Sequence, residues 1–420
     1  MSGTEADQLA YLQSSVVNAP VRTALRGLGI MPRRIRRESI QHRPGAGVTG
    51  IYRVEVSGAS TGGPARQVGV EHLFLGVTTE AVQDRSTVTV VDSEVGSLHI
   101  WRHPADPELP GFHLAADPAA VVQQWGRGRG LLSLETISYR PLRRAVILAI
   151  FDDGERVFLK ALRRGAAARL DDRHRMLAEA GLPVPMPVDR PHCDVLALPD
   201  GGGEPLAEAF LADGAAQLSP GLFVELLDGL PEQVLTLAQR PSWSDQLDSY
   251  TDAAVSALPE CAERIQALSG RIAAELPLTE TGPLVPTHGD FYEANILMQD
   301  GAVSSLLDVD SLGPGRRIDD LACFLGHLAV LPAVDARYIH APAAFSRFAA
   351  DFAQRTDPHG LRLRSAAVAL SLVAGARDTS RSTWRQEAEH RLSCAEALLG
   401  TVSRGPALPQ WPADTRPRGR

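Results

Sequence analysis

The sequence predicts a mixed α+β fold, and three observations lead to that prediction. Strand-like alternation of apolar residues is concentrated before residue 204, whereas helical periodicity dominates from about Pro205 onward. The third observation is size, because 420 residues that are 44% hydrophobic and 22% charged suffice for two or three domains with ordinary cores. This composition excludes a disordered, collagen-like or coiled-coil chain.

The first strand region contains an internal repeat. Two pairs of segments match. Glu38–Pro44 resembles Glu135–Pro141, and each is followed by an alternating strand pattern; further along, Glu71–Gly76 resembles Glu155–Lys160. The matching segments start 33 residues apart in the first copy and 20 in the second, which predicts a 13-residue insertion around the Gly- and Ser-rich residues 57–66. We interpret the repeat as a duplicated β-hairpin unit in which Gly76 stands at the position of Lys160.

The second copy leads into a regular series of elements. The patterns predict a strand over 146–151, a turn at Asp152-Asp153-Gly154, a strand over 157–162, a helix over 167–180 and a strand over 194–198. Gly181 follows the helix as a candidate C-cap. Gly201–Gly203 is interpreted as a flexible hinge that ends this part of the chain.

Helical patterns fill most of the remaining sequence. Apolar residues recur at three- and four-residue spacing over 206–213, 219–239, 243–276 and from 318 to about 399, with prolines such as Pro220, Pro231 and Pro241 as breaks. The exception is 285–309, where two short strand-like runs enclose a polar loop. The tail, residues 404–420, is rich in proline and is predicted to be disordered.

Lysine is almost absent from the chain. Lys160 is the only lysine among 42 Lys+Arg residues, so the other 41 are arginines. The formal net charge is −8; residues 1–130 hold 13 Arg and 12 Asp+Glu, so the remainder carries −9. Because nucleic-acid binding needs a basic face, this mildly acidic chain is not expected to bind nucleic acid.

The sequence also indicates a cytoplasmic location. The four cysteines are far apart and form no CxxC pair, which predicts reduced, mostly buried thiols rather than disulfides or a zinc cluster. The N-terminal residues do not resemble a signal peptide. The longest apolar stretch, 321–334, is too short to span a bilayer and contains His327. No membrane partner is therefore expected.

The residues that carry chemistry cluster between 287 and 310. Thr287-His288-Gly289-Asp290 is followed by Asn295, five residues beyond Asp290, and by Asp308 at the end of an apolar run, 13 residues beyond Asn295. A carboxylate and an amide oxygen are typical ligands of Mg²⁺ bound to nucleotide phosphates. Phosphoryl transfer also needs positive charge at the phosphates, which an upstream strand lysine would supply in part.

These motifs resemble the aminoglycoside phosphotransferase and choline kinase superfamily. Its catalytic loop, His-Gly-Asp followed by four residues and Asn, matches 288–295; its metal-binding aspartate matches Asp308, and its Asp-Leu-Ala matches 320–322. The resemblance covers about residues 133–400, and the general layout is similar to the maltokinase-like branch, which has an N-terminal cap. It implies a bilobal protein-kinase-like fold, with a β-rich N-lobe and a helical C-lobe, preceded here by an α/β cap domain.

The resemblance also implies roles for individual residues. Lys160 would pair with the α- and β-phosphates of ATP, and Asp290 would orient and deprotonate the acceptor hydroxyl. Asn295 and Asp308 would hold Mg²⁺. His288 and Asp320 would brace the catalytic loop through hydrogen bonds to its backbone. For Asp310, a loop-capping role and a second metal or acceptor contact both remain open, and Asp319 is expected to be solvated.

Two departures from the family pattern concern the nucleotide. The loop between the first two N-lobe strands, residues 139–144, contains no glycine, so its backbone amides approach phosphates less freely. Arg143 or Arg144 would replace that contact with a side chain, or would lie in solvent. The family's glutamate partner for the lysine has no evident counterpart; Asp171 and Asp172 are the nearby acids.

The sequence therefore predicts a small-molecule kinase that transfers the γ-phosphoryl group of ATP to a hydroxyl of an antibiotic, sugar or amino alcohol. The alternative is a nucleotide-binding pseudokinase or regulatory module, which the missing glycines and the long N-terminal extension favour. The predicted division is a cap over 1–132, an N-lobe over 133–203, a C-lobe over 204–403 and a tail over 404–420. The acceptor, the choice of ATP over GTP and the oligomeric state are left open.

Overall fold

The computed structural model describes residues 3–43, 47–57, 70–378 and 381–400. The chain divides into two compact units, each described by itself below. Unit 1 comprises Met1–Asp172 and Pro187–Asp200, and unit 2 comprises Arg173–Met186 and Gly201–Arg420.

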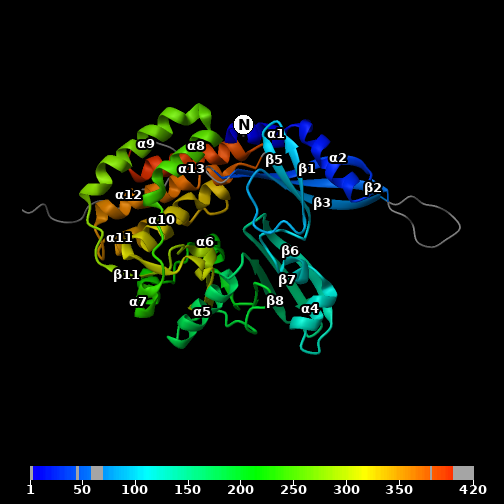
Figure 1. Cartoon of the computed structure of the whole chain (residues 1–420). Coiled ribbons are helices and arrows are strands. Elements are labelled where there is room, and N and C mark those ends of the chain that lie inside the picture. Colours follow the sequence, from blue (N-terminus) through cyan, green and yellow to red (C-terminus); the bar gives the residue numbers. More distant parts are fainter. Residues whose placement is uncertain (1–2, 44–46, 58–69, 379–380, 401–420) are drawn as a thin grey trace, which may run out of the picture. The chain divides into compact units, whose positions relative to one another are not determined.

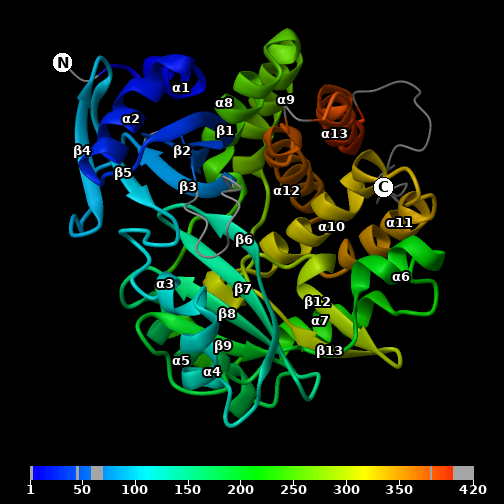
Figure 2. The same ribbon diagram turned by 90° about the vertical axis from the view of Figure 1, so that its right-hand side faces the viewer.

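Unit 1 begins with a five-stranded antiparallel sheet in the order β1-β2-β3-β5-β4. Its elements are α1 (Glu5–Gln13), η1 (Ser15–Val17), α2 (Asn18–Gly27), β1 (Pro32–Arg43), β2 (Gly47–Ser57), β3 (Val70–Thr78), β4 (Val88–Ser93) and β5 (Gly96–Arg102). The two helices pack on the sheet, burying Leu12 and Val21 against strand residues such as Val54 and Leu75. Figures 1 and 2 show them in blue beside these strands.

A second antiparallel sheet of unit 1 has the order β6-β7-β8-β9 (Figure 2). It consists of β6 (Leu131–Arg140), β7 (Arg144–Phe151), β8 (Arg156–Leu162) and β9 (Val195–Pro199), with α3 (Phe112–Ala115) and α4 (Pro118–Trp125) before it. Alternate residues of β7 are buried, as expected for a strand with one covered face. Phe112 and Trp125 of the two helices pack on that face beside Ile147 and Phe151.

The sequence repeat corresponds to two three-stranded antiparallel meanders, β1-β2-β3 and β6-β7-β8. The predicted insertion lies between β2 and β3, and most of it is outside the described residues. Gly76 has a steric reason to lack a side chain: a Cβ there would lie 2.1 Å from ring atoms of Trp101. In the first meander, the space that a side chain at Gly76 would occupy is filled by the indole ring of Trp101 on the neighbouring strand β5. Lys160 stands at the equivalent position of the second meander.

Unit 2 is mainly helical. After α5 (Ala166–Glu179), which runs from unit 1 into unit 2, the helices are α6 (Leu206–Asp213), α7 (Pro220–Asp228), α8 (Leu247–Ala257), α9 (Ala262–Glu275), α10 (Arg317–Val334), α11 (Ala341–Phe352), α12 (Pro358–Ser371) and α13 (Trp384–Leu398). Short 3-10 turns connect them: η2 (Glu232–Thr236), η3 (Ser244–Gln246), η4 (Pro259–Cys261), η5 (Leu276–Leu278), η6 (Glu293–Asn295), η7 (Val309–Ser311) and η8 (Ala374–Ala376). Helix α10 contacts α11, α12 and α13, and Figure 1 shows this group in yellow to red.

Two small antiparallel sheets interrupt the helices of unit 2. One has the order β10-β12-β13 and the other pairs β11 with β14. Their strands are β10 (Glu204–Pro205), β11 (Leu284–Thr287), β12 (Ile296–Gln299), β13 (Ala302–Leu306) and β14 (Gly313–Arg316). The predicted region 285–309 therefore contains three strands rather than two, because β12 and β13 form a tight hairpin across Asp300-Gly301.

An aromatic cluster forms part of the core of unit 2. Phe324 of α10 lies within ring-contact distance of Phe210, Phe223, Phe348 and Phe352, and all five side chains are fully buried. Phe291 of the predicted catalytic loop joins the cluster, with its ring centroid 5.9 Å from that of Phe324. The loop is thereby anchored to the core by the residue that follows Asp290.

The predicted α+β class is confirmed, and the antiparallel sheets together with the helical part are consistent with a protein-kinase-like fold. The N-terminal cap and the four-part division of the chain remain predictions, and the predicted tail, 404–420, lies outside the described residues. All four cysteines are free, and three of them are buried, as expected. Among the described helices, none is both long enough and apolar enough to cross a membrane.

Candidate active site

The predicted catalytic loop lies between β11 and η6 in unit 2. Strand β11 pairs with β14, and the Thr287 hydroxyl donates a 2.8 Å hydrogen bond to the Gly313 carbonyl at the end of that pairing. The chain then leaves the sheet, so that Asp290 lies in the loop with its side chain half-buried. His288, two residues earlier, and Phe291, the next residue, are both buried, so the partly open carboxylate is held between two anchored side chains.

Gly289 is required by the backbone. Its φ is +81°, and a Cβ at this position would lie 2.7 Å from the carbonyl oxygen of Ser311. Any side chain would therefore be strained twice, by the left-handed backbone and by the contact. The glycine of the His-Gly-Asp motif thus has a physical cause in the fold.

Asp320, in the first turn of α10, is hydrogen-bonded to the backbone of this loop. Its two carboxylate oxygens accept hydrogen bonds from the backbone N–H groups of His288 (2.9 Å) and Gly289 (2.8 Å). Asp320 is 1% exposed. Burial raises its pKa to about 6, although the two backbone hydrogen bonds and Arg317 favour the charged form. The two hydrogen bonds join Asp320 to the loop backbone, and its role as a brace of the catalytic loop stays a prediction.

His288 is also buried, and its hydrogen bonds define its tautomer. The backbone N–H of Asp290 donates to Nδ1 over 3.3 Å, so Nε2 carries the proton and donates to the Leu307 carbonyl at 2.9 Å. Burial lowers the pKa of His288, which keeps the ring neutral. With both ring nitrogens hydrogen-bonded, His288 links the predicted catalytic loop to Leu307, the residue before Asp308.

Asn295 is bonded directly to Asp290. Its Nδ2 donates to the backbone carbonyl of Asp290 at 2.9 Å and lies 3.5 Å from the carboxylate oxygen Oδ2. The amide nitrogen thus faces Asp290, and the amide oxygen is the atom left for a cation. The backbone carbonyl of Asn295 accepts a hydrogen bond from the N–H of Leu307 at 2.8 Å. Asp308 is the residue that follows Leu307, so this bond ties the two predicted metal ligands together through the backbone.

Asp308 ends the run after β13 in the left-handed conformation, with φ 53° and ψ 48°. Such a backbone is uncommon outside glycine and Asn/Asp, and it turns the chain sharply into η7. The donor set of one carboxylate and one amide oxygen is chemically suited to Mg²⁺. Asp310 lies in η7, and its backbone carbonyl accepts a hydrogen bond from Arg173; its predicted alternatives stay open.

The predicted phosphate-binding residues lie in unit 1. Lys160 is half-buried on β8, paired with Val146 of β7 and Leu196 of β9, so it stands inside the sheet rather than at its edge. Arg143 forms a 3.2 Å ion pair with Glu80, and Arg144 opens β7. The Arg143 guanidinium therefore has a protein partner already.

The two acids proposed for Lys160 differ in environment. Asp171 is 1% exposed and forms an ion pair with Arg190, whereas the side chain of Asp172 is 72% exposed and lies 3.7 Å from the same arginine. Which acid, if either, serves as the partner of Lys160 remains a prediction.

The loop between β6 and β7 is anchored to the N-terminal part of unit 1. Leu142 adopts φ +61° and is buried against Val82 and Trp101. The carboxylate of Asp106, 4% exposed, accepts hydrogen bonds from the Leu142 N–H and the Tyr139 hydroxyl. Burial raises the pKa of Asp106, and these hydrogen bonds oppose that shift. The β6–β7 loop, which lacks glycine, is therefore held in place through the backbone N–H of Leu142.

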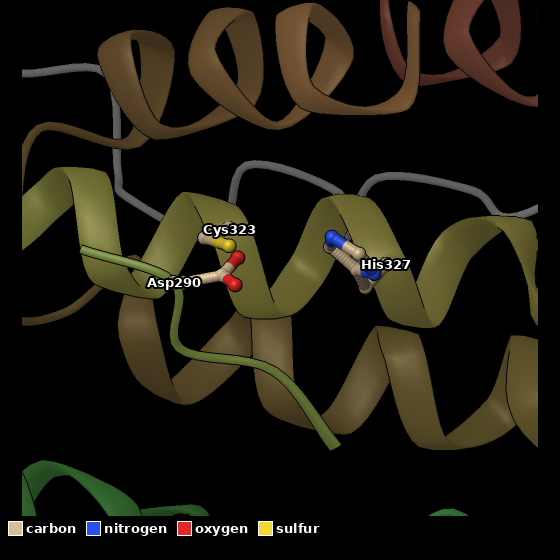
Figure 3. Close-up of side chains that lie close together, drawn as sticks. All are labelled: Asp290, Cys323 and His327. Atoms are coloured by element: carbon tan, nitrogen blue, oxygen red, sulfur yellow. The ribbon is translucent and has the colours of Figure 1, made fainter. Parts of the chain in front are cut away.

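Sequence reasoning missed several groups around Asp290. Glu293 is 5% exposed, and burial raises its pKa to about 7. Cys323 and His327, one turn apart on α10, approach the Asp290 carboxylate (Figure 3). Tyr292 stacks on His327 with ring centroids 3.9 Å apart. The spacing of Cys323 and His327 within an apolar helix was the only available signal.

The expectation that Asp319 is solvated is wrong. Its carboxylate accepts a 3.2 Å hydrogen bond from Nε of Arg364 on α12, and Arg364 is itself only 6% exposed. Burial raises the pKa of Asp319 to about 6 despite that arginine. A charge pair between α10 and α12 cannot be read from adjacent residues in the sequence.

Comparisons with known proteins define the class. The sequence model of the phosphotransferase enzyme family (APH) matches residues 145–355, half of the chain. The chain therefore belongs to this family, and the predicted resemblance to aminoglycoside phosphotransferases and choline kinases is confirmed. A search of curated proteins finds no significant match.

Several solved structures are similar to parts of the chain. Macrolide 2′-phosphotransferase MphH from Brachybacterium faecium is 21% identical, with 66% of this chain and 97% of that chain covered and a TM-score of 0.38. A thermostable mutant of aminoglycoside phosphotransferase APH(4)-Ia, in complex with AMP-PNP and hygromycin B, is 16% identical, with coverages of 68% and 100% and a TM-score of 0.47. An ethanolamine kinase from Plasmodium vivax is 11% identical, with coverages of 67% and 89% and a TM-score of 0.43.

Proposed function

We propose that this phosphotransferase is a small-molecule kinase that transfers the γ-phosphoryl group of ATP to a hydroxyl of an antibiotic, sugar or amino-alcohol acceptor. The observation that carries the proposal is the fixed position of Asp290. Asp320, His288 and Asn295 each bond to the loop backbone around it, while its carboxylate stays half-buried and accessible.

In this proposal Asp290 acts as the general base. The acceptor oxygen bonds to the γ-phosphorus, the bond from that phosphorus to the bridging oxygen of ADP breaks, and the hydroxyl proton passes to the Asp290 carboxylate. His288 cannot take this role because its Nδ1 accepts from the loop and its Nε2 proton is bonded to Leu307. Neutral His288 instead keeps Asp290 in place.

Asn295 and Asp308 would hold Mg²⁺, which neutralises phosphate charge when bound. Lys160 would contribute its ammonium to the α- and β-phosphates. Arg143 and Arg144 are the weaker assignments, because Arg143 already pairs with Glu80. We assign the N-lobe to 133–203 and the C-lobe to 204–403, with 1–132 as the cap, and a cytoplasmic location.

One observation favours the alternative of a nucleotide-binding regulatory module. The N–H of Leu142, which lies at the turn where a phosphate-binding loop would offer amides, is bonded to Asp106. A chain with such a turn would bind nucleotide through Lys160 and the cation alone, and its turnover would be slow or absent.

Purified full-length protein with Mg-ATP and a panel of hydroxyl acceptors separates the two. The kinase predicts phosphorylated product by mass spectrometry with the wild type and a loss of about 100-fold or more with Asp290→Ala, since a general base contributes at least that much. Asp248→Ala, an exposed carboxylate on α8, is the matched control and should retain activity. Tight ATP binding with no product from any acceptor would favour the regulatory module.

A further inference from the structure

A carboxylate, a thiol and an imidazole converge at the catalytic loop. Cys323 and His327 are four residues apart on α10 and so share one face of the helix. Asp290 approaches that face from the loop, and one ligand atom from each of the three residues lies within 4.8 Å of the others (Figure 3). The roles proposed for phosphoryl transfer use the carboxylate but neither the thiol nor the imidazole.

The imidazole of His327 is positioned but lacks a hydrogen bond at one nitrogen. Its Nε2 is buried and has no hydrogen-bond partner among the described residues. Tyr292 stacks on the ring with ring centroids 3.9 Å apart, and Trp243 makes a T-shaped contact with ring centroids 6.4 Å apart. Packing therefore fixes the plane of the imidazole. Burial lowers the pKa of His327 to about 3, which leaves the ring neutral. A neutral, oriented imidazole is the form that binds metals.

The thiol completes a set that hard cations do not favour. Cys323 is 1% exposed, and burial raises its pKa, so without a cation the sulfur keeps its proton. Sulfur, nitrogen and carboxylate oxygen together suit Zn²⁺, whereas Mg²⁺ takes oxygen ligands. This set is therefore chemically distinct from Asn295 and Asp308.

The geometry is close to what Zn²⁺ needs. Tetrahedral Zn²⁺ with bonds of roughly 2.0–2.3 Å places its ligand atoms about 3.3–3.8 Å apart, so the three groups must close by about 1 Å. Asp290 lies in a loop, and both Asp290 and His327 are half-buried, so two of the three ligand residues remain partly open to solvent.

We propose that Asp290, Cys323 and His327 form a binding site for Zn²⁺ and that the bound ion blocks the Asp290 carboxylate. On binding, the thiol proton is released to solvent and the thiolate, one imidazole nitrogen and one carboxylate oxygen become ligands. The metal site stands on these three side chains alone. Its inhibitory effect rests on the proposed function, because a carboxylate held by Zn²⁺ cannot accept the proton of an acceptor hydroxyl.

Cobalt titration of the full-length protein tests the site without any turnover. Co²⁺ replaces Zn²⁺ and reports a thiolate ligand through a near-ultraviolet charge-transfer band. The wild type should bind one Co²⁺ per chain with this band, and Zn²⁺ should abolish it. Cys323→Ala should lose the band, and His327→Gln should weaken binding by at least about tenfold. Circular dichroism of both variants establishes that they are folded.

Two other thiols provide the controls. Cys394→Ala removes a buried thiol on α13 and should leave the band unchanged. Cys193→Ser removes an exposed thiol whose sulfur lies 3.5 Å from Nε2 of His192, a competing site that must be separated. A band that survives Cys323→Ala, or that disappears with Cys193→Ser, would overturn the proposal.

The kinase assay then tests the consequence of binding. Zn²⁺ should lower wild-type turnover in the presence of excess Mg²⁺, and a chelator should restore it. Full turnover with the site saturated would overturn the blocking role. Failure to find product with any acceptor would count against the proposed function, whereas the cobalt band would still support the cation site.

Discussion

The carboxylate oxygen Oδ2 of Asp106 accepts a 2.9 Å hydrogen bond from the backbone N–H of Leu142. The same oxygen accepts a 2.7 Å hydrogen bond from the Tyr139 hydroxyl, and Leu142 is held at φ +61°. One buried acid therefore fixes both sides of the β6–β7 turn. The N-terminal part of unit 1 thereby determines the conformation of a loop in the predicted N-lobe.

Asp106→Ala should destabilise the protein by about 1–3 kcal/mol, because the buried Leu142 N–H and Tyr139 hydroxyl would both lose a partner. Asp106→Asn should cost less, since the amide oxygen can still accept one hydrogen bond. Urea denaturation measures both. Asp92→Ala, an exposed carboxylate bonded to Ser97 in the first sheet, should change the stability by less than about 0.5 kcal/mol. Equal losses for Asp106→Ala and Asp92→Ala would contradict the role of Asp106.

Asp320→Asn should impair turnover more than nucleotide binding. The asparagine keeps one acceptor oxygen for the two N–H groups of His288 and Gly289, so the loop around Asp290 loses part of its support. We expect kcat to fall by at least about tenfold, equivalent to ~1.4 kcal/mol, with KM for ATP nearly unchanged. Steady-state kinetics with a responsive acceptor measures the split. A rise in KM for ATP at constant kcat would place Asp320 with the nucleotide instead.

Lys160→Arg tests the lone lysine. The substitution keeps the charge, but a planar guanidinium is larger and distributes its charge differently from a compact ammonium on phosphate. Lys160 is half-buried between two strands, which leaves little room for adjustment. We expect turnover to fall by at least about tenfold. Arg156→Lys, the reciprocal exchange at an exposed position of the same strand, should be nearly neutral, and near-normal activity of Lys160→Arg would remove the assignment.

Much of the catalytic loop could be predicted from the sequence because its parts are close together along the chain. His288, Asp290 and Asn295 are placed by one turn that requires Gly289, and Asp320 meets them at the start of the next long helix. Alternation and glycine signals likewise placed the β6–β8 meander, since strands joined by short turns pair locally.

The remaining features depend on contacts between distant residues. Asp106 reaches a turn 36 residues later, and no local pattern distinguishes it from an exposed acid. Cys323 and His327 resemble ordinary core residues of an apolar helix until the loop brings Asp290 to them. The environment of Asp319 could not be predicted for the same reason, because only the packing of α12 on α10 supplies Arg364 and removes most of the water.

Arg364→Met should reduce stability in a pH-dependent way. It leaves Asp319, whose side chain is 22% exposed, without its hydrogen-bonded cation, a loss of about 1–3 kcal/mol when the carboxylate is charged. The pKa of Asp319 is already raised to about 6 by burial, and removal of the arginine should raise it further. The folded protein would then take up a proton more readily than the unfolded chain, so the stability of the variant should be greatest at low pH and fall as pH rises through that pKa.

Urea denaturation at pH 5 and pH 8 measures this difference. Relative to wild type, Arg364→Met should lose more stability at pH 8 than at pH 5, where Asp319 can be protonated. Arg355→Met is the matched control, because Arg355 forms an exposed pair with Asp351 on the neighbouring helix and should cost at most about 1 kcal/mol at either pH. A loss for Arg364→Met that is equal at both pH values would mean that packing of the arginine, rather than its charge beside Asp319, holds α10 and α12 together.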